Sequence, residues 1–204
     1  MPLPIAPEFR VHWLSLAAAL AVLVMASHRW LWPLWGLLAV LAFLWRDPRR
    51  RPPADPLAVL APVDGRVLAV ERATDPWLDR PAWRVRLRQS PLGPFALFSP
   101  TEGKLMEHWR RGRRDQEGAL YACWLRTDED DDVTLVIDLR RWPRALRSPW
   151  RVGERLGQGQ RCGLAGYGVV VSVYLPAGAA PTVVVGERLR GGRDVLGKFV
   201  HEGS

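Results

Sequence analysis

Hydrophobic residues form two uninterrupted runs near the start of the chain, whereas the remainder alternates short apolar stretches with polar turns. The runs extend over Val11–Ser27 and Trp30–Trp45 and are separated by His28 and Arg29. A helix of about 16 residues covers roughly 24 Å, slightly less than the roughly 30 Å of a bilayer's hydrocarbon core. The pattern predicts an N-terminal transmembrane helical hairpin that spans the bilayer thinly or dips into it. A signal peptide and a buried helical pair are the alternatives.

Basic residues follow the second run directly, at Arg46, Arg49, Arg50 and Arg51. By the positive-inside rule they place the downstream chain in the cytoplasm, attached to the inner (cytoplasmic) membrane. We predict that these arginines bind lipid headgroups; a topology signal without specific lipid binding is the alternative. The proline-rich residues 51–56 resemble a short stiff linker. The predicted organisation is therefore a membrane anchor over residues 1–50 and a β domain over residues 51–204.

The downstream part contains short runs rich in β-branched and aromatic residues, separated by glycine, proline and charged turns. Such runs are typical of strands. The acidic run Asp128–Asp132 lacks the spaced ligands of a calcium loop, so a solvated hairpin tip is expected and no metal site is predicted. A basic loop is expected at Arg110–Arg114. The strands are predicted at Val67–Glu71, Trp83–Leu87, Phe95–Phe98, Ala119–Leu125, Val133–Leu139, Val169–Leu175 and Thr182–Val185.

Two sequence patterns occur twice within the β domain. The pattern Pro-x-acid-Gly-base-apolar occurs at Pro62–Val67 and at Pro100–Leu105, and Val-Gly-Glu-Arg-Leu occurs at Val152–Leu156 and Val185–Leu189. Each repeat is a turn between short strands. The arrangement is similar to barrel-sandwich folds of the lipoyl and biotinyl type, in which such hairpins are related by pseudo-symmetry. The predicted fold is mainly β, a barrel-sandwich β domain.

The positive charge of the chain comes almost entirely from arginine. Lys104 and Lys198 are the only lysines among 29 basic residues, and the formal net charge is +8. Arginine suits planar contacts with phosphate or carboxylate. No nucleic-acid-binding motif accompanies this charge, so nucleic acid is not an expected partner. Cys123 and Cys162 lack the spacing of a zinc site or a disulfide framework.

In their order along the chain, these segments resemble the phosphatidylserine decarboxylases, in particular the short bacterial form. The resemblance rests on an aromatic-Arg-Asp-Pro segment, the Pro-x-Asp-Gly-x-Val turn, Ser-Pro before a strand, a second proline turn and a glycine-rich segment leading into a strand. In this chain they lie at Trp45–Arg49, Pro62–Val67, Ser90-Pro91, Pro100–Lys104 and Gly157–Pro176. Membership implies a pyruvoyl enzyme that cuts itself at a Gly-Ser bond. The serine becomes the pyruvoyl cofactor, which decarboxylates phosphatidylserine to phosphatidylethanolamine.

The catalytic positions of that family are mostly substituted here. Counted back from Pro176, the family's Gly-Ser pair falls on Gly168 and Val169, and valine has no hydroxyl to start the acyl shift. The family's assisting histidine falls on Phe95. Asp64 is the one retained position of the processing set, and a turn-forming role explains it better than a remaining acid-base role.

The sequence thus predicts a divergent, catalytically inactive homologue without a pyruvoyl cofactor. Its predicted partner is membrane phospholipid, held by the arginines and by an apolar slot near Phe95, Leu97, Phe98 and Val169. A protein partner or homo-oligomer is also compatible with the pattern. Two alternatives stay open: an active decarboxylase that uses an unrecognised nucleophile, and a lipoyl-like structural adaptor of a membrane assembly.

Overall fold

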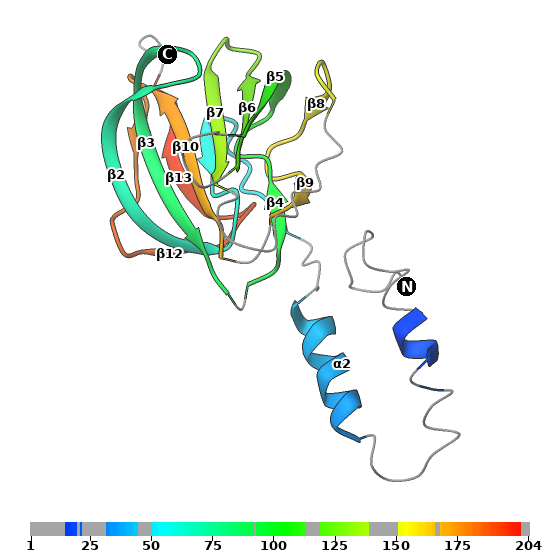
Figure 1. Ribbon diagram of the computed structural model, residues 1–204. Coiled ribbons are helices and arrows are strands. Elements are labelled where there is room, and N and C mark those ends of the chain that lie inside the picture. The colour runs from blue at the N-terminus through cyan, green and yellow to red at the C-terminus, as the bar shows by residue number, and fades with distance from the viewer. Residues whose placement is uncertain are drawn as a thin grey trace. The chain divides into compact units, whose positions relative to one another are not determined.

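The computed structural model describes residues 15–19, 21, 32–44, 50–91, 93–112, 119–138, 151–165 and 168–200 (Figure 1). The chain divides into two compact units, residues 1–49 and 50–204. Helix α2 (Trp32–Leu44) belongs to the first unit, in which residues 15–19 and 21 are also helical. Arg46 and Arg49 lie outside the described residues. The division falls one residue before the predicted one, and Arg50 is joined to the β domain by an ion pair with Asp64.

The predicted transmembrane hairpin is not supported by the described residues. None of the helices among them is long and apolar enough to cross a membrane. α2 extends over 13 residues, about 20 Å at 1.5 Å per residue.

The second unit is mainly β, as predicted, and its described residues form three sheets. The largest has eight strands in the order β12-β2-β3-β10-β7-β6-β5-β8, and β2, β3 and β10 curl around the core (Figure 1). Smaller sheets are formed by β1, β13 and β11 and by β4 and β9. The strands are β1 (Ala58–Leu60), β2 (Gly65–Asp75), β3 (Arg80–Gln89), β4 (Ala96–Phe98), β5 (Gly103–Gly112), β6 (Ala119–Arg126), β7 (Asp132–Asp138), β8 (Arg155–Leu156), β9 (Arg161–Leu164), β10 (Val170–Pro176), β11 (Ala180–Pro181), β12 (Arg188–Leu189) and β13 (Val195–Lys198).

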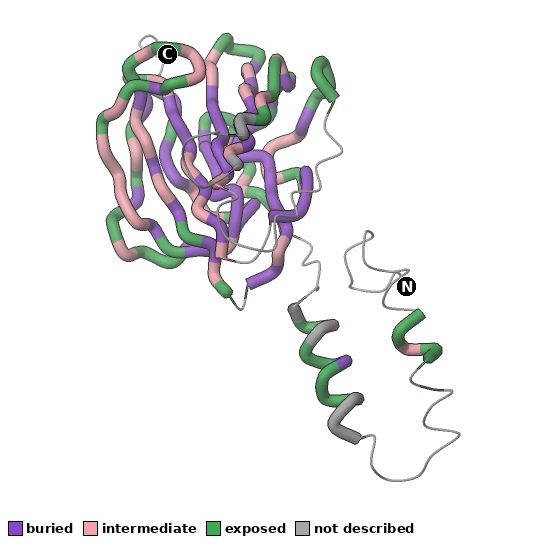
Figure 2. Tube along the Cα trace, in the orientation of Figure 1, coloured by how far each residue is buried: buried purple, intermediate pink, exposed green. Residues whose placement is uncertain are grey.

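Alternation along the strands explains which face of the large sheet is buried. In β10, Val171, Val173 and Leu175 are fully buried in the main core, whereas Ser172 between them is half-buried. Neighbouring β3 contributes Val85 and Leu87 to the same core. Figure 2 shows the buried residues on the inner side of the curled sheet, with half-buried and exposed residues around them. The period of two residues places alternate side chains on opposite faces.

The two repeated sequence patterns occupy equivalent positions in two halves of the domain. The Leu60 N–H donates to the Pro100 carbonyl (2.7 Å), and the Phe98 N–H donates to the Pro62 carbonyl (2.8 Å). A side chain at Gly65 or Gly103 would collide with a carbonyl oxygen of the neighbouring strand. Each copy therefore needs glycine at the same point, where the backbones approach closely.

A buried polar network links the β2–β3 hairpin turn to β7. Asp75 is 0 % exposed and accepts hydrogen bonds from the Thr134 hydroxyl (2.6 Å) and the Trp77 N–H (3.0 Å). Arg80 Nε lies 4.0 Å from the Asp75 carboxylate and also forms an ion pair with Asp132. The carboxylate thus accepts hydrogen bonds from the hairpin turn and from β7, and Arg80 balances its charge.

Most of the predicted strands are confirmed. Six of the seven predicted ranges overlap observed strands, namely β2, β3, β4, β6, β7 and β10. The acidic run forms the turn between β6 and β7, as expected, with Asp128, Glu129 and Asp130 exposed. The predicted strand at Thr182–Val185 is wrong, because this segment leads into a turn. The predicted start of the basic loop at Arg110–Arg114 is also wrong, because Arg110 lies within β5.

Candidate functional site

The candidate site begins at the turn that leads into β10. Gly168 has a φ of +61°, in the left-handed region that favours glycine. Val169 follows it and is only 1 % exposed, within the main hydrophobic core. Its carbonyl accepts a hydrogen bond from the Gln89 N–H at 3.0 Å. A self-processing turn would present a hydroxyl at this position, and the chain presents two methyl groups.

The Asp64 carboxylate is engaged at both oxygens. Oδ2 lies 2.7 Å from Arg50 Nη2, and Oδ1 accepts a hydrogen bond from the Gly191 N–H at 2.8 Å. The Arg50 and Asp64 side chains are 14 % and 16 % exposed. Charge-assisted hydrogen bonds of this kind are among the stronger ones in proteins. Asp64 therefore holds the start of the domain against the loop at Gly191.

The structure brings Asp64 and Val169 to the same end of β3. Two consecutive residues make the connection: the Gln89 N–H donates to Val169, and the Ser90 N–H donates to the Asp64 carbonyl (2.8 Å). The predicted site residues Asp64, Gly168 and Val169 are therefore neighbours across one strand end. Their separation in sequence is about 100 residues.

Gln89 is a buried polar residue that the sequence analysis missed. It is 1 % exposed, and its Nε2 donates to the Pro94 carbonyl at 3.2 Å. Within the described part of the chain, its Oε1 has no hydrogen-bond partner. The sequence does contain a signal for this buried position, namely a glutamine at the end of an otherwise apolar strand face, immediately before Ser-Pro.

Phe95 lies beside this strand end and precedes β4. Its carbonyl accepts a hydrogen bond from the Ala165 N–H at 2.8 Å. Leu97, Phe98 and Val169 are all buried. Side chains thus fill the position where the sequence predicted an apolar slot. The ring of Phe98 packs so closely on Gly191 and Gly192 that an added methyl group would contact it.

Other nucleophiles near the site are poorly placed. The Cys162 thiol donates to the Leu97 carbonyl (3.3 Å), and burial raises its pKa well above the usual value. Burial likewise raises the pKa of Cys123. A thiol with a raised pKa is a weak nucleophile because the thiolate is the reactive form. Ser172 pairs with Arg86 and Val136 on the face of β10 opposite Val171.

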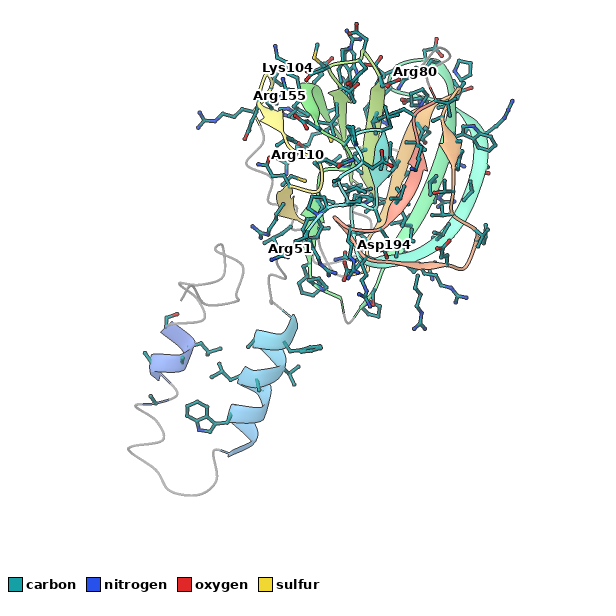
Figure 3. All side chains as sticks on the ribbon, turned by 180° about the vertical axis from the view of Figure 1, so that it is seen from behind. Arg51, Arg80, Lys104, Arg110, Arg155 and Asp194 are labelled. Carbon is teal, nitrogen blue, oxygen red and sulfur yellow. The ribbon has the colours of Figure 1, made fainter. Side chains whose placement is uncertain are left out.

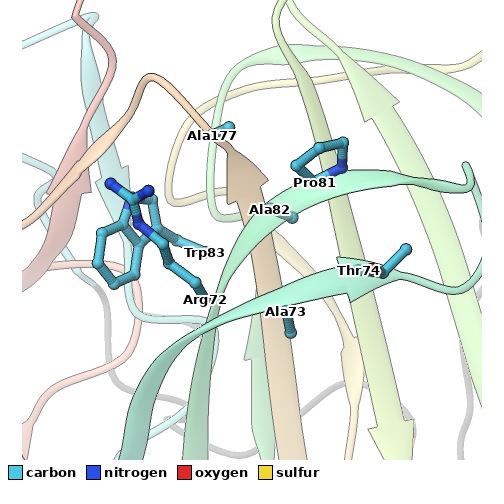
Figure 4. A pocket seen from close by; sticks show the side chains of 7 residues that line it. All are labelled: Arg72, Ala73, Thr74, Pro81, Ala82, Trp83 and Ala177. Atoms are coloured by element: carbon cyan, nitrogen blue, oxygen red, sulfur yellow. The ribbon is translucent and has the colours of Figure 1, made fainter.

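A separate pocket of about 320 Å³ opens near the β2–β3 hairpin turn, lined in part by Arg72, Trp83 and Ala177. The Arg72 guanidinium lies 5.0 Å from the centre of the Trp83 ring (Figure 4). The pocket includes none of the predicted site residues. It lies at the opposite end of β2 and β3 from Gly65 and Gln89, so it is not part of the candidate site.

The fold and the site together define a repeated β domain with a left-handed glycine, an ion-paired aspartate and a buried valine directly after the glycine. The chain is 32 % identical to a phosphatidylserine decarboxylase proenzyme of Nitrosomonas europaea over 194 residues, covering 90 % of both chains. It is 31 % identical to the proenzyme of Aromatoleum aromaticum, covering 91 % of both, and to that of Burkholderia lata, covering 97 % of this chain and 98 % of the relative. No family model matches, and no solved structure matches. The chain belongs to the phosphatidylserine decarboxylase family, as its sequence predicted.

Proposed function

We propose that this chain is a member of the phosphatidylserine decarboxylase family that neither processes itself nor decarboxylates its lipid, and that it binds phospholipid. The observation that carries the proposal is Val169, buried at 1 % exposure directly after a left-handed Gly168. Self-processing needs an oxygen nucleophile at this position. The family's pyruvoyl group does not fit here, since it derives from serine and a valine side chain has no oxygen.

The Arg50–Asp64 ion pair supports the same proposal. General acid-base catalysis needs a group within hydrogen-bond reach of the proton that it transfers. Both Asp64 oxygens already accept hydrogen bonds, from Arg50 and from Gly191. We infer that Asp64 now stabilises the domain and does not move a proton.

The mass of the purified protein tests the loss of processing. We expect a single polypeptide near 23.0 kDa under denaturing conditions, since Val169 has no hydroxyl to form the ester intermediate. Mass spectrometry of the intact chain makes the measurement. Two fragments that meet at Gly168-Val169 or at Val171-Ser172, with a blocked amino terminus on the smaller one, would contradict the proposal and restore an active decarboxylase.

We also propose that the first unit attaches the protein to the inner membrane, with the β domain facing the cytoplasm. The support is the exposure of Trp35, Leu37, Val40 and Phe43 on α2. Exposed apolar groups of this size are typical of membrane or protein contacts. A protein partner and homo-oligomerisation remain predictions. For the second unit, the repeated turns support a barrel-sandwich arrangement of the lipoyl and biotinyl type.

The basic segment that follows α2 in the sequence gives a test of lipid binding. Replacing Arg46, Arg49 and Arg51 with Ala should weaken binding to anionic vesicles by about tenfold or more, because each arginine near such a surface contributes about 1 kcal/mol. Arg50 is left unchanged, since it pairs with Asp64. Vesicle co-sedimentation at low and high salt makes the measurement. Unchanged binding would remove these arginines from the proposal.

A further inference from the structure

Three exposed arginines lie side by side on adjacent strands of the large sheet. Arg188 of β12 is directly opposite Arg66 of β2, which is directly opposite Arg88 of β3. We call these three residues the open arginine row. Their sequence neighbours Val67, Leu87 and Leu189 are buried, so the arginines share the outer face. Like charges directly opposite one another destabilise a sheet unless an anion compensates them.

The second half of the domain contains an equivalent basic row, and there the charges are compensated. Arg155 of β8 is opposite Lys104 of β5, which is opposite Arg126 of β6; these residues form the paired row. Arg126 lies 2.8 Å from Asp132, and Arg155 contacts Glu102 and Asp128. Hydrogen bonds to Asp132 and Asp128 raise the pKa of Arg126 and Arg155, respectively. This half of the chain supplies its own carboxylates.

The open arginine row has no such compensation. Among the described residues, no carboxylate lies within ion-pair distance of its three guanidinium groups. Asp64 occupies the position in its repeat that Glu102 occupies in the other, and it already forms an ion pair with Arg50. The Glu187 carboxylate accepts the Val184 N–H (3.0 Å). Within the described residues, the one side-chain hydrogen bond of the row joins Arg66 Nε to the Gly186 carbonyl (2.7 Å), which leaves most of its donors available.

Two exposed valines adjoin the open arginine row. Val184 and Val185 are 68 % and 64 % exposed, in the turn before β12. The Arg66 guanidinium contacts Gly186, the residue after Val185, so it lies on the same turn as the two valines. Basic residues beside exposed aliphatic side chains suit an anionic bilayer, because the charges attract headgroups while the apolar tip enters the interface. Single-stranded nucleic acid would favour aromatic stacking residues in place of valines.

We propose that the open arginine row and the Val184–Val185 turn form a docking surface for an anionic phospholipid bilayer. The proposal rests on the phospholipid binding proposed above and assigns a surface for it on the β domain itself. Gln89 follows Arg88, and Asp64 lies two residues before Arg66. Docking through this surface therefore brings the end of the domain that contains Asp64 and Val169 to the headgroups.

Vesicle binding of charge variants of the full chain tests the arginines. The row variant replaces Arg66, Arg88 and Arg188 with Gln. Its matched control replaces Lys104, Arg110 and Arg155 with Gln, three exposed basic residues on another edge of the domain (Figure 3). With vesicles of phosphatidylcholine and phosphatidylglycerol, we expect the row variant to bind about tenfold to hundredfold more weakly and the control to bind within about twofold of the parent. Pure phosphatidylcholine vesicles should not distinguish the proteins.

A fluorescence experiment tests the valine turn independently of charge. Val185→Cys carries an environment-sensitive dye, and Val152→Cys is its matched control, since Val152 is 57 % exposed in the equivalent turn of the other half. The native Cys123 and Cys162 are buried, so the introduced thiol is the one that reacts in the folded protein. Anionic vesicles should shift the emission of the dye at 185 to shorter wavelength and leave the dye at 152 unchanged. Equal spectra at both positions would contradict insertion of the turn.

The outcomes separate this proposal from the proposed function. If the parent protein ignores anionic vesicles, phospholipid binding itself is wrong. If the row variant binds like the parent while the variant of Arg46, Arg49 and Arg51 does not, lipid binding stands and this docking surface is wrong. A third outcome is that the parent binds single-stranded DNA, the row variant loses this binding, and the parent binds vesicles only weakly. The partner would then be nucleic acid and not a bilayer. A melting temperature equal to or above that of the parent confirms that the row variant is folded.

Discussion

The Asp64→Ala variant should unfold at a temperature about 6 to 12 °C below that of the parent protein, a loss of about 3 kcal/mol. The substitution leaves the Arg50 guanidinium, 14 % exposed, without its carboxylate, and removes the acceptor of the Gly191 N–H. Removing one partner of a mostly buried ion pair leaves an uncompensated charge, which is costlier than removing both. Differential scanning calorimetry makes the measurement.

A double-mutant cycle with Arg50→Ala isolates the ion pair. The single Arg50→Ala variant should also be destabilised, by about 2 kcal/mol, and the double variant should be more stable than the sum of the two effects by about 1 kcal/mol or more. Arg51→Ala is the matched control. Arg51 is the exposed neighbour of Arg50, so its replacement should change the free energy of unfolding by less than about 0.5 kcal/mol. Additive effects within error would show that Asp64 does not depend on Arg50, which would reopen an acid-base role.

The Asp75→Ala variant should lose about 3 kcal/mol of stability for a different reason. Asp75 is fully buried, so its removal leaves the Thr134 hydroxyl and the Trp77 N–H without their acceptor. It also takes a negative charge away from Arg80, whose Nε lies 4.0 Å from the carboxylate and has no hydrogen-bond partner in the described part of the chain. Urea unfolding followed by circular dichroism measures the change through the transition midpoint.

Two further substitutions sharpen this second prediction. Asp75→Asn keeps the size and one acceptor oxygen, so it should cost less than Asp75→Ala. Glu129→Ala, on the exposed tip between β6 and β7, should change stability by less than about 0.5 kcal/mol. If Asp75→Ala were as stable as the parent, the buried network would not stabilise the hairpin turn.

The sequence predicted the main strands because their patterns are local. In β10 and β7, runs of β-branched residues are bounded by turns, which is a local signal of a strand. β5 was missed because Arg110 and Arg111 give its end the composition of a loop. The segment at Thr182–Val185 has the composition of a strand, yet Val184 and Val185 are exposed in a turn. Composition alone does not show whether a neighbouring strand is available for pairing.

The candidate site was predicted in part for the same reason. Gly168, Val169 and Asp64 were found by their place in sequence motifs, and the structure makes them neighbours through Gln89 and Ser90. The ion pair of Arg50 with Asp64 could not be predicted, because an arginine cluster offers several equivalent partners. The difference between the two basic rows could not be predicted from the sequence either. It depends on which carboxylates the fold places beside them, whereas the sequence shows only that both rows are basic.

The pairing of the first strand with the last has a consequence for synthesis of the protein. β1 is covered by β13, and Ala58 pairs with Lys198, about 140 residues later in the chain. At a translation rate of about 5 to 20 residues per second, β1 waits about 7 to 28 s for its partner on the ribosome. Val59 and Leu60, fully buried in the finished domain, are without the strand that pairs with them throughout this interval. The sheet of β1, β13 and β11 therefore closes only after β13 has been made.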